Sequence, residues 1–151
     1  MTGEPASAEL DLERFLPYRL SVLSNTVSAK IAAHYEKRFD LSIPQWRVIA
    51  VLGRFPGLSQ NDVAERTAMD KVQVSRAVTT LVKAGRVRRV RDESDGRAVR
   101  LELAPAGHVI FDEVVPFARA LEARLLDGLA GTDLQSLDGL IARLTTAAAA
   151  L

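Results

Sequence analysis

The spacing of apolar residues changes at Gly85 from a helical to an alternating pattern, and that change limits the folds the chain can adopt. Before Gly85, apolar residues repeat at three- and four-residue intervals, the period of an amphipathic α-helix. After it, the short segments 86–91 and 98–103 alternate between apolar and polar residues, as β-strands do, and a polar turn at 92–97 joins them. Helical periodicity resumes beyond the turn. The sequence therefore predicts a mainly α-helical chain with one small β-hairpin.

Residues that suit a helix N-cap indicate where the helices begin. Ser42 and Gln45 have the spacing of a capping box, in which each side chain bonds the other's backbone N–H. Ser59, Asp70 and Thr132 can each cap a following helix in the same way. The predicted helices run from 17 to 38, from 42 to 55, over a short stretch from 59, from 70 to 84, from 105 to 129 with Pro116 as a candidate bend, and from 132 onwards.

Basic residues are concentrated in one segment. From Arg66 to Arg91 there are eight basic residues and one acidic residue, Asp70, which is a net charge of +7 in a chain whose net charge is +1. Such a segment is the electrostatic pattern expected for contact with nucleic-acid phosphates. The alternative, a solvated charged surface, usually alternates in sign along the chain. This segment does not alternate, which favours the phosphate interpretation.

The helix predicted at 70–84 has one apolar and one polar side. At 100° per residue, Val74, Val78 and Leu81 fall together with Ala77. An α-helix fits the major groove of DNA, where arginine reads guanine and glutamine reads adenine. An ordinary amphipathic surface helix is the alternative, because such helices are common. The residues of this helix predicted to contact DNA are Lys71, Gln73, Ser75, Arg76, Thr79, Thr80 and Lys83.

The basic hairpin that follows makes the DNA interpretation stronger. Arg89 and Arg91 on its first strand, and Asp95 and Arg97 in its turn, are predicted to belong to the DNA-binding site. An arginine at a protruding tip suits the minor groove, where the potential is most negative. Asp95 can accept hydrogen bonds that hold the turn or Arg97 itself; a plain Asp-Gly turn is the alternative.

Two short helices followed by a basic hairpin are the order of a winged helix-turn-helix protein, and here the chain resembles the multiple-antibiotic-resistance regulator (MarR) family. The resemblance extends from about Leu12 to Leu144 and is most specific at 69–85 and 91–107. The wing signature of the family is matched by Asp95, Arg97, Leu103 and Gly107. In two departures from it, Gly96 stands where the family often has a second arginine, and Ala104 replaces a frequent threonine.

The resemblance implies an obligate homodimer with a helical dimerisation region built from the first and the last two helices. The residues agree, because Leu- and Ala-rich stripes at both ends of the chain would otherwise be exposed apolar patches. Three regions are expected: an N-terminal dimerisation helix at 1–40, a winged helix-turn-helix DNA-binding lobe at 41–104 and C-terminal dimerisation helices at 105–151. The expected function is a ligand-responsive repressor that recognises a pseudo-palindromic operator in double-stranded DNA.

Family members commonly bind a small effector between the dimerisation helices and the DNA-binding lobe. Segments 15–25 and 44–48 resemble the branch that controls aromatic-acid catabolism, some of whose members respond to aromatic acyl-CoA thioesters. An aromatic acid or its acyl-CoA is therefore the expected effector. The alternative is that the aromatic residues are simply core. The predicted effector-binding residues are Tyr18, Arg19, His34, Tyr35, Arg38, Trp46, Phe111 and Phe117.

Other classes of function have no sequence support. The chain contains no cysteine, no Gly-rich phosphate loop, no nucleophile elbow and no HExxH motif, and its two histidines are far apart. Neither catalysis nor a metal or other cofactor is predicted. No apolar run approaches the roughly 18 residues needed to span a bilayer, and the polar start is unlike a signal peptide, so a cytoplasmic location is expected. The remaining alternative is a winged-helix module for protein–protein assembly without DNA binding.

Overall fold

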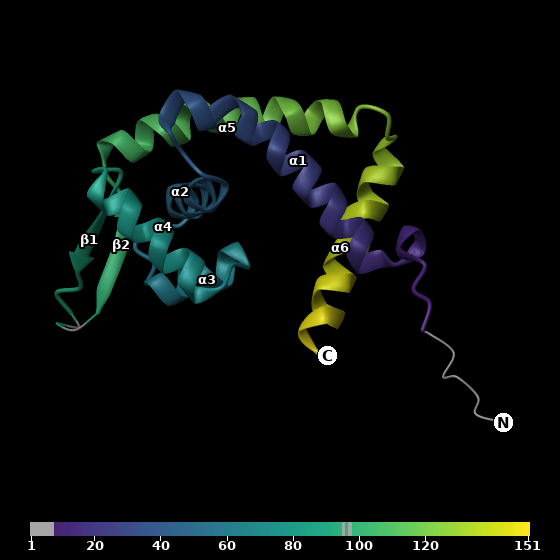
Figure 1. The fold of residues 1–151 in the computed structure, drawn as a ribbon, viewed down its shortest axis with the longest axis horizontal. Coiled ribbons are helices and arrows are strands. Elements are labelled where there is room, and N and C mark those ends of the chain that lie inside the picture. Colours follow the sequence, from purple (N-terminus) through teal and green to yellow (C-terminus); the bar gives the residue numbers. More distant parts are fainter. Residues whose placement is uncertain (1–7, 95, 97) are drawn as a thin grey trace. The chain divides into compact units, whose positions relative to one another are not determined.

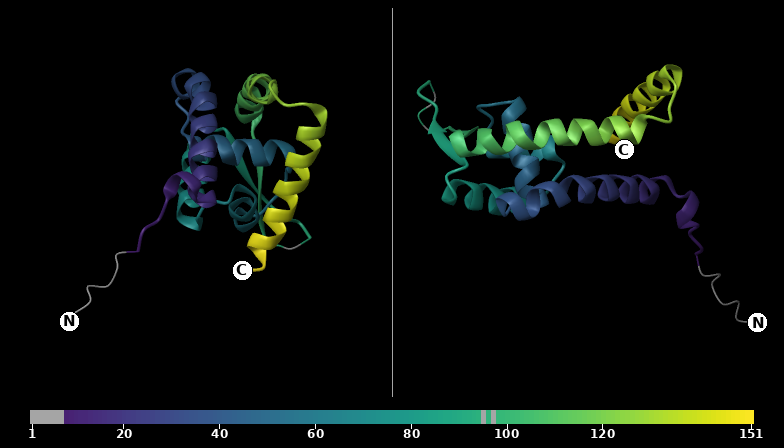
Figure 2. Two further views of the ribbon diagram at one scale, coloured as in Figure 1. Left: turned by 90° about the vertical axis from the view of Figure 1, so that its right-hand side faces the viewer. Right: turned by 90° about the horizontal axis from the view of Figure 1, so that it is seen from above.

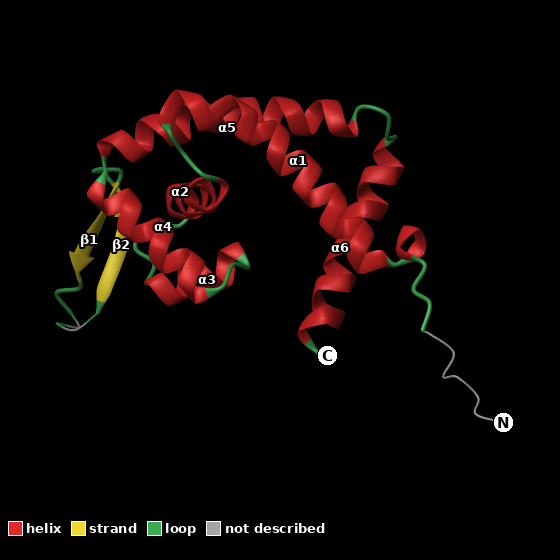
Figure 3. Cartoon of the chain, in the orientation of Figure 1, coloured by secondary structure: helices red, strands yellow, loops and turns green. Residues whose placement is uncertain are grey.

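A computed structural model describes residues 8–94, 96 and 98–151 and confirms the mainly helical chain with one hairpin (Figure 3). The chain forms two compact units, the first ending at Phe111 and the second beginning at Asp112. The three-region organisation inferred from the sequence stays a prediction. The elements are the 3-10 turn η1 (Leu12–Arg14), α1 (Leu16–Phe39), α2 (Ile43–Arg54), α3 (Gln60–Thr67), α4 (Lys71–Lys83), β1 (Val87–Arg91), β2 (Val99–Leu103), α5 (Pro105–Leu126) and α6 (Gly131–Ala149).

Three of the predicted caps are formed. Gln45 donates its backbone N–H to Ser42 Oγ at 3.3 Å, and Ser42 donates its own to Gln45 Oε1 at 3.1 Å, which completes the capping box of α2. Ser59 has the same relation to α3. The backbone N–H of Gln73 donates to Asp70 Oδ1 at 2.8 Å and fixes the start of α4. These caps satisfy backbone donors that have no intrahelical partner, so the starts of α2, α3 and α4 follow from local chemistry.

The predicted start of the last helix is wrong by two residues. Gly131, expected in a break, is the first residue of α6, and Ala130 stands at the cap in place of Thr132. The reason is that the Asp133 carboxylate accepts the Ala130 backbone N–H at 3.1 Å, so an acidic side chain in the first turn fixes the start of the helix in place of a threonine at the cap. Helix α5 continues through Pro116 and ends at Leu126, three residues earlier than predicted.

The first unit contains a lobe in which α2, α3, α4 and the hairpin pack on one another (Figure 1). Helix α2 contacts α3, α4 and β2, and α4 contacts α3 and β1. Strands β1 and β2 are antiparallel, with Val87 opposite Leu103 and Arg91 opposite Val99. The hairpin projects beyond the lobe's helices (Figure 2). Buried apolar side chains hold the base of the hairpin in the lobe core. The core includes Val48, Ile49, Leu52, Val63, Val74, Val78, Leu81, Val87, Leu101 and Leu103.

The loop between α2 and α3 adds a third, short strand-like segment that the sequence analysis did not predict. Leu101 donates its backbone N–H to Leu58 O at 2.8 Å, and Gly57 donates to Leu101 O at 2.9 Å. Gly57 has a positive φ of 85°, a conformation that favours glycine. One residue cannot show an alternating pattern, so no sequence period marks this bridge. It anchors β2 against the helices.

Gly107 on α5 lies against the backbone at the start of the hairpin. A Cβ at this position would lie 2.1 Å from the carbonyl oxygen of Arg86. We expect Gly107→Ala to lower the free energy of unfolding by about 2 kcal/mol, since the atom in the way belongs to backbone. Gly128→Ala is the control, because a Cβ there meets no atom within 4 Å. Equal denaturation midpoints for the two variants would contradict the close approach.

None of the described helices is both long and apolar enough to cross a membrane.

Candidate nucleic-acid interface

Helix α4 presents the two sides that the sequence predicted. Val74, Val78 and Leu81 are at most 1% exposed and pack in the lobe core with Ala77. Burial of this side fixes which residues the helix turns outward. Its predicted DNA contacts are all exposed: Lys71, Gln73, Ser75, Arg76, Thr79, Thr80 and Lys83. The helix therefore combines a packed side, which holds it in place, with an exposed side that is polar and basic apart from Val72, which is 58% exposed.

An open cleft lies beside Arg76, between α4 and the first turn of α2. Residues Ser42, Pro44 and Gln45 line it from α2. On α4 it is lined by Gln73, Arg76, Ala77 and Thr80. The hydroxyl of Thr80 donates to the Arg76 carbonyl at 3.0 Å, so its proton is already used within the helix. The start of α2 was not among the predicted DNA contacts, because only a tertiary contact brings it there.

The hairpin neutralises part of its own charge. Arg88 Nε lies 2.6 Å from Glu102 Oε1 on the facing strand, and Arg100 pairs with Asp92 at 3.3 Å. Arg89 and Arg91, the two predicted strand contacts, are exposed and form no ion pair with any described residue. The predicted tip residues, Asp95 and Arg97, lie outside the described residues. The described wing thus offers Arg89 and Arg91 as its available cations.

Two further arginines of the basic segment have structural contacts. The Arg66 guanidinium lies 4.0 Å from the centroid of the Phe55 ring. Arg86 Nη2 donates to the carbonyl oxygen of Phe39, at the end of α1. The basic segment is therefore only partly available for phosphate contact. Its exposed cations that form neither an ion pair nor a contact with an aromatic ring among the described residues are Lys71, Arg76, Lys83, Arg89 and Arg91.

Some predicted effector-binding residues pack in the first unit. Tyr35 is 1% exposed, and its ring centroid lies 5.7 Å from that of Trp46. Burial raises the pKa of Tyr35 to about 12, with a smaller contribution from Glu36. The Phe111 ring covers Gly53, where a Cβ would lie 2.2 Å from it. This packing is what a core role predicts for Tyr35 and Phe111; an effector role stays a prediction.

The other predicted effector-binding residues are more accessible or lie elsewhere. Tyr18 and Arg19 are exposed on α1. His34 is partly buried on the same helix, and the exposed Arg38 guanidinium lies 5.3 Å from the Phe39 ring centroid. Phe117 belongs to the second unit. Within the first unit, the structure brings together Tyr35 and Trp46 from this set.

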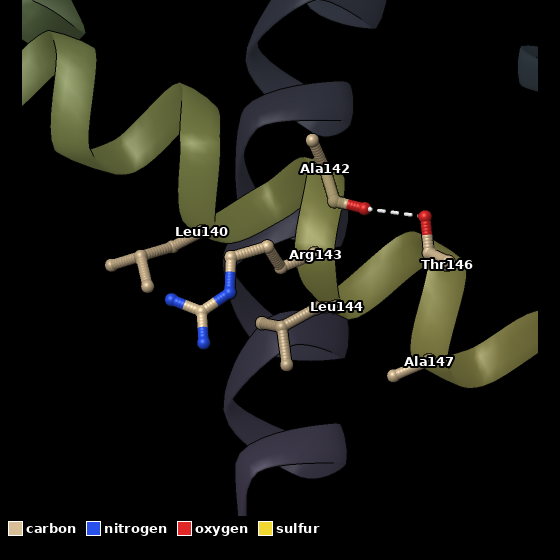
Figure 4. A pocket seen from close by; sticks show the side chains of 6 residues that line it. All are labelled: Leu140, Ala142, Arg143, Leu144, Thr146 and Ala147. Carbon is tan, nitrogen blue, oxygen red and sulfur yellow. Dashed lines mark hydrogen bonds between the residues drawn. The ribbon is translucent and has the colours of Figure 1, made fainter.

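Apolar side chains remain exposed on α1 and α6. In the described chain α6 buries none of its residues, and Leu140, Ile141 and Leu144 are 51%, 54% and 46% exposed. Figure 4 shows Leu140, Arg143 and Leu144 around an open hollow on this helix. The first half of α1 likewise exposes Leu16, Leu20 and Leu23. Contiguous apolar surface of this kind indicates an interaction site.

Comparisons with known proteins agree with this architecture. Residues 39–98 match the sequence model of the MarR family. An HTH-type transcriptional repressor of Mycobacterium tuberculosis is 27% identical over 113 residues, covering 74% of this chain and 78% of the repressor.

Solved structures extend the similarity over most of the chain. A MarR-family transcriptional regulator of Silicibacter pomeroyi has a TM-score of 0.78 and 29% identity, covering 92% of this chain and 98% of that one. FabT of Streptococcus pneumoniae, solved in complex with DNA, has a TM-score of 0.72 and 25% identity, covering 90% and 96%.

Proposed function

We propose that this chain is a repressor that binds duplex operator DNA as a homodimer. The family match and the similar structures support its assignment as a MarR-family winged-helix transcription regulator. The observation that carries the proposal is the exposed polar side of α4 beside a hairpin with two arginines that pair with no carboxylate of the described residues. The helix has the dimensions to enter a major groove, and the arginines have the charge to contact the phosphates or the minor groove next to it.

A homodimer accounts for the apolar surfaces of α1 and α6. Leu140, Ile141 and Leu144 are each about half exposed in the single chain, which is costly unless a second copy covers them. A two-fold dimer presents two copies of α4 to successive major grooves. The proposed operator is therefore pseudo-palindromic, with half-sites roughly 10 bp apart from centre to centre. As a DNA-binding regulator the protein would act in the cytoplasm.

We expect specific binding to DNA from upstream of the protein's own gene, with an affinity that falls steeply as salt rises. Each phosphate that a cation neutralises adds about −0.9 to the slope of log affinity against log salt. The measurement is an electrophoretic mobility shift at several salt concentrations, with a scrambled duplex as control. An assembly module without DNA binding predicts no shift. An affinity independent of salt would also contradict the proposal.

The proposal includes an effector, an aromatic carboxylate or its CoA thioester, that lowers operator affinity. A ligand that prefers one spacing of the two DNA-binding lobes shifts the dimer towards or away from DNA, and linkage requires operator DNA to change ligand affinity by the same factor. Trp46 is the only tryptophan in the chain, so its fluorescence can follow ligand binding. Titrations with and without operator should give different dissociation constants; equal constants would mean that the ligand is not the switch.

A further inference from the structure

Arg86 belongs to the basic segment, yet its side chain turns to the protein interior. Its Nη2 donates to the carbonyl oxygen of Phe39, 47 residues earlier in the chain, and the contact is partly buried. Phe39 is the last residue of α1, and Asp40 ends the helix in the left-handed conformation. Carbonyls in the last turn of a helix have no intrahelical donor and carry the negative end of the helix dipole. The Arg86 guanidinium is therefore a favourable partner for the Phe39 carbonyl.

The backbone of Arg86 is fixed as firmly as its side chain. Its N–H donates to Leu81 O at 2.9 Å, and its carbonyl accepts the Ala104 N–H at 3.0 Å. The same carbonyl lies against Gly107 at the start of α5. The next residue along the chain, Val87, is 2% exposed and opens strand β1. One residue thus joins the end of α1, the end of α4 and the base of the hairpin.

We propose that Arg86 is a positioning residue that ties the wing to α1. Because of this tie, α1, with its exposed apolar stripe, and the wing arginines move as one body. The inference rests on the proposed function in one respect: α1 is taken to belong to the dimer interface. If it does, the tether makes the placement of Arg89 and Arg91 depend on how two copies of α1 pack. Arg86 itself then contributes no phosphate contact, although it adds to the charge of the basic segment.

The test begins with the free protein. Arg86→Met keeps the apolar stem and removes every donor, whereas Arg86→Lys keeps a cation that can still donate to Phe39 O. Hydrogen exchange of the hairpin amides 87–91 and 99–104 should be about tenfold faster in R86M, because a charge-assisted hydrogen bond is lost, and intermediate in R86K. Arg88→Met, two residues further along on β1, is the matched control, since the exposed pair of Arg88 with Glu102 contributes little. Equal exchange in R86M and R88M would overturn the proposal.

The second arm uses operator DNA and a double-mutant cycle. R86M should weaken binding several-fold in the wild-type background and have no further effect when Arg89 and Arg91 are already alanine, because Arg86 acts through them. If R86M lowers operator affinity by the same factor in both backgrounds, Arg86 is a separate DNA contact and the proposal is wrong. If the wild-type protein binds no DNA, the proposed function fails, but the exchange experiment still decides whether the tether exists. Far-ultraviolet circular dichroism checks that each variant is folded, and R86K provides the comparison if R86M is not.

Discussion

Replacing both Leu140 and Leu144 with glutamate is expected to give a monomer that binds operator DNA at least 100-fold more weakly than the wild-type protein. The two side chains line the open hollow on α6 and are about half exposed in the single chain. Carboxylates buried in an apolar interface without partners would oppose association by several kcal/mol. A monomer can occupy only one half-site, so it loses the gain of roughly 10²–10⁴ that comes from binding the second half-site intramolecularly.

Sedimentation velocity and a mobility shift measure the two consequences separately. Gln135→Glu is the control, because at 100° per residue it adds a negative charge, one where the test variant adds two, on the opposite side of α6. This variant should remain dimeric and bind normally. Leu140→Ala with Leu144→Ala adds no charge and should weaken the dimer to a lesser extent. A glutamate variant that stays dimeric, or a monomer with full operator affinity, would refute the proposed arrangement.

Local chemistry made much of the fold predictable. The caps at Ser42, Ser59 and Asp70 are formed by side chains within three residues of the helix start, so the sequence already contains both partners. The apolar side of α4 was predictable for the same reason, since its period is the period of the helix. The start of α6 shows the limit of local patterns. Both Thr132 and Asp133 could form the hydrogen bonds at this helix end, and the sequence pattern favoured Thr132, whereas the structure uses Asp133.

Contacts between distant residues were not predictable. The bridge from Leu58 to Leu101 and the hydrogen bond from Arg86 to Phe39 join segments that are more than 40 residues apart. No local period marks either of them. The pairing of the wing arginines was not predictable for the same reason. Arg89 and Arg91 were predicted as contacts without regard to their partners, and only the strand register places Glu102 opposite Arg88 and leaves Arg89 without an acidic partner among the described residues.

Arg76→Ala is expected to weaken operator binding by about 1–3 kcal/mol, roughly 5- to 150-fold, and to relax the preference at one base pair. Arg76 lies in the middle of the exposed side of α4, beside the cleft shared with the start of α2. No carboxylate among the described residues pairs with it, so its guanidinium is free to make two parallel hydrogen bonds to a guanine. The measurement is the affinity for the operator and for every single-base variant of one half-site.

Arg76→Lys separates reading of a base from contact with a phosphate. Lysine keeps the positive charge but cannot form the planar bidentate pair, so R76K should recover part of the affinity while the base preference stays relaxed. Lys83→Ala, at the end of the same exposed side, is the comparison for a phosphate contact: it should weaken binding equally on all sequences and lower the salt slope by about 1. If R76A behaves like K83A, and R76K restores wild-type binding on every half-site variant, Arg76 contacts a phosphate and the base is read by another residue of α4.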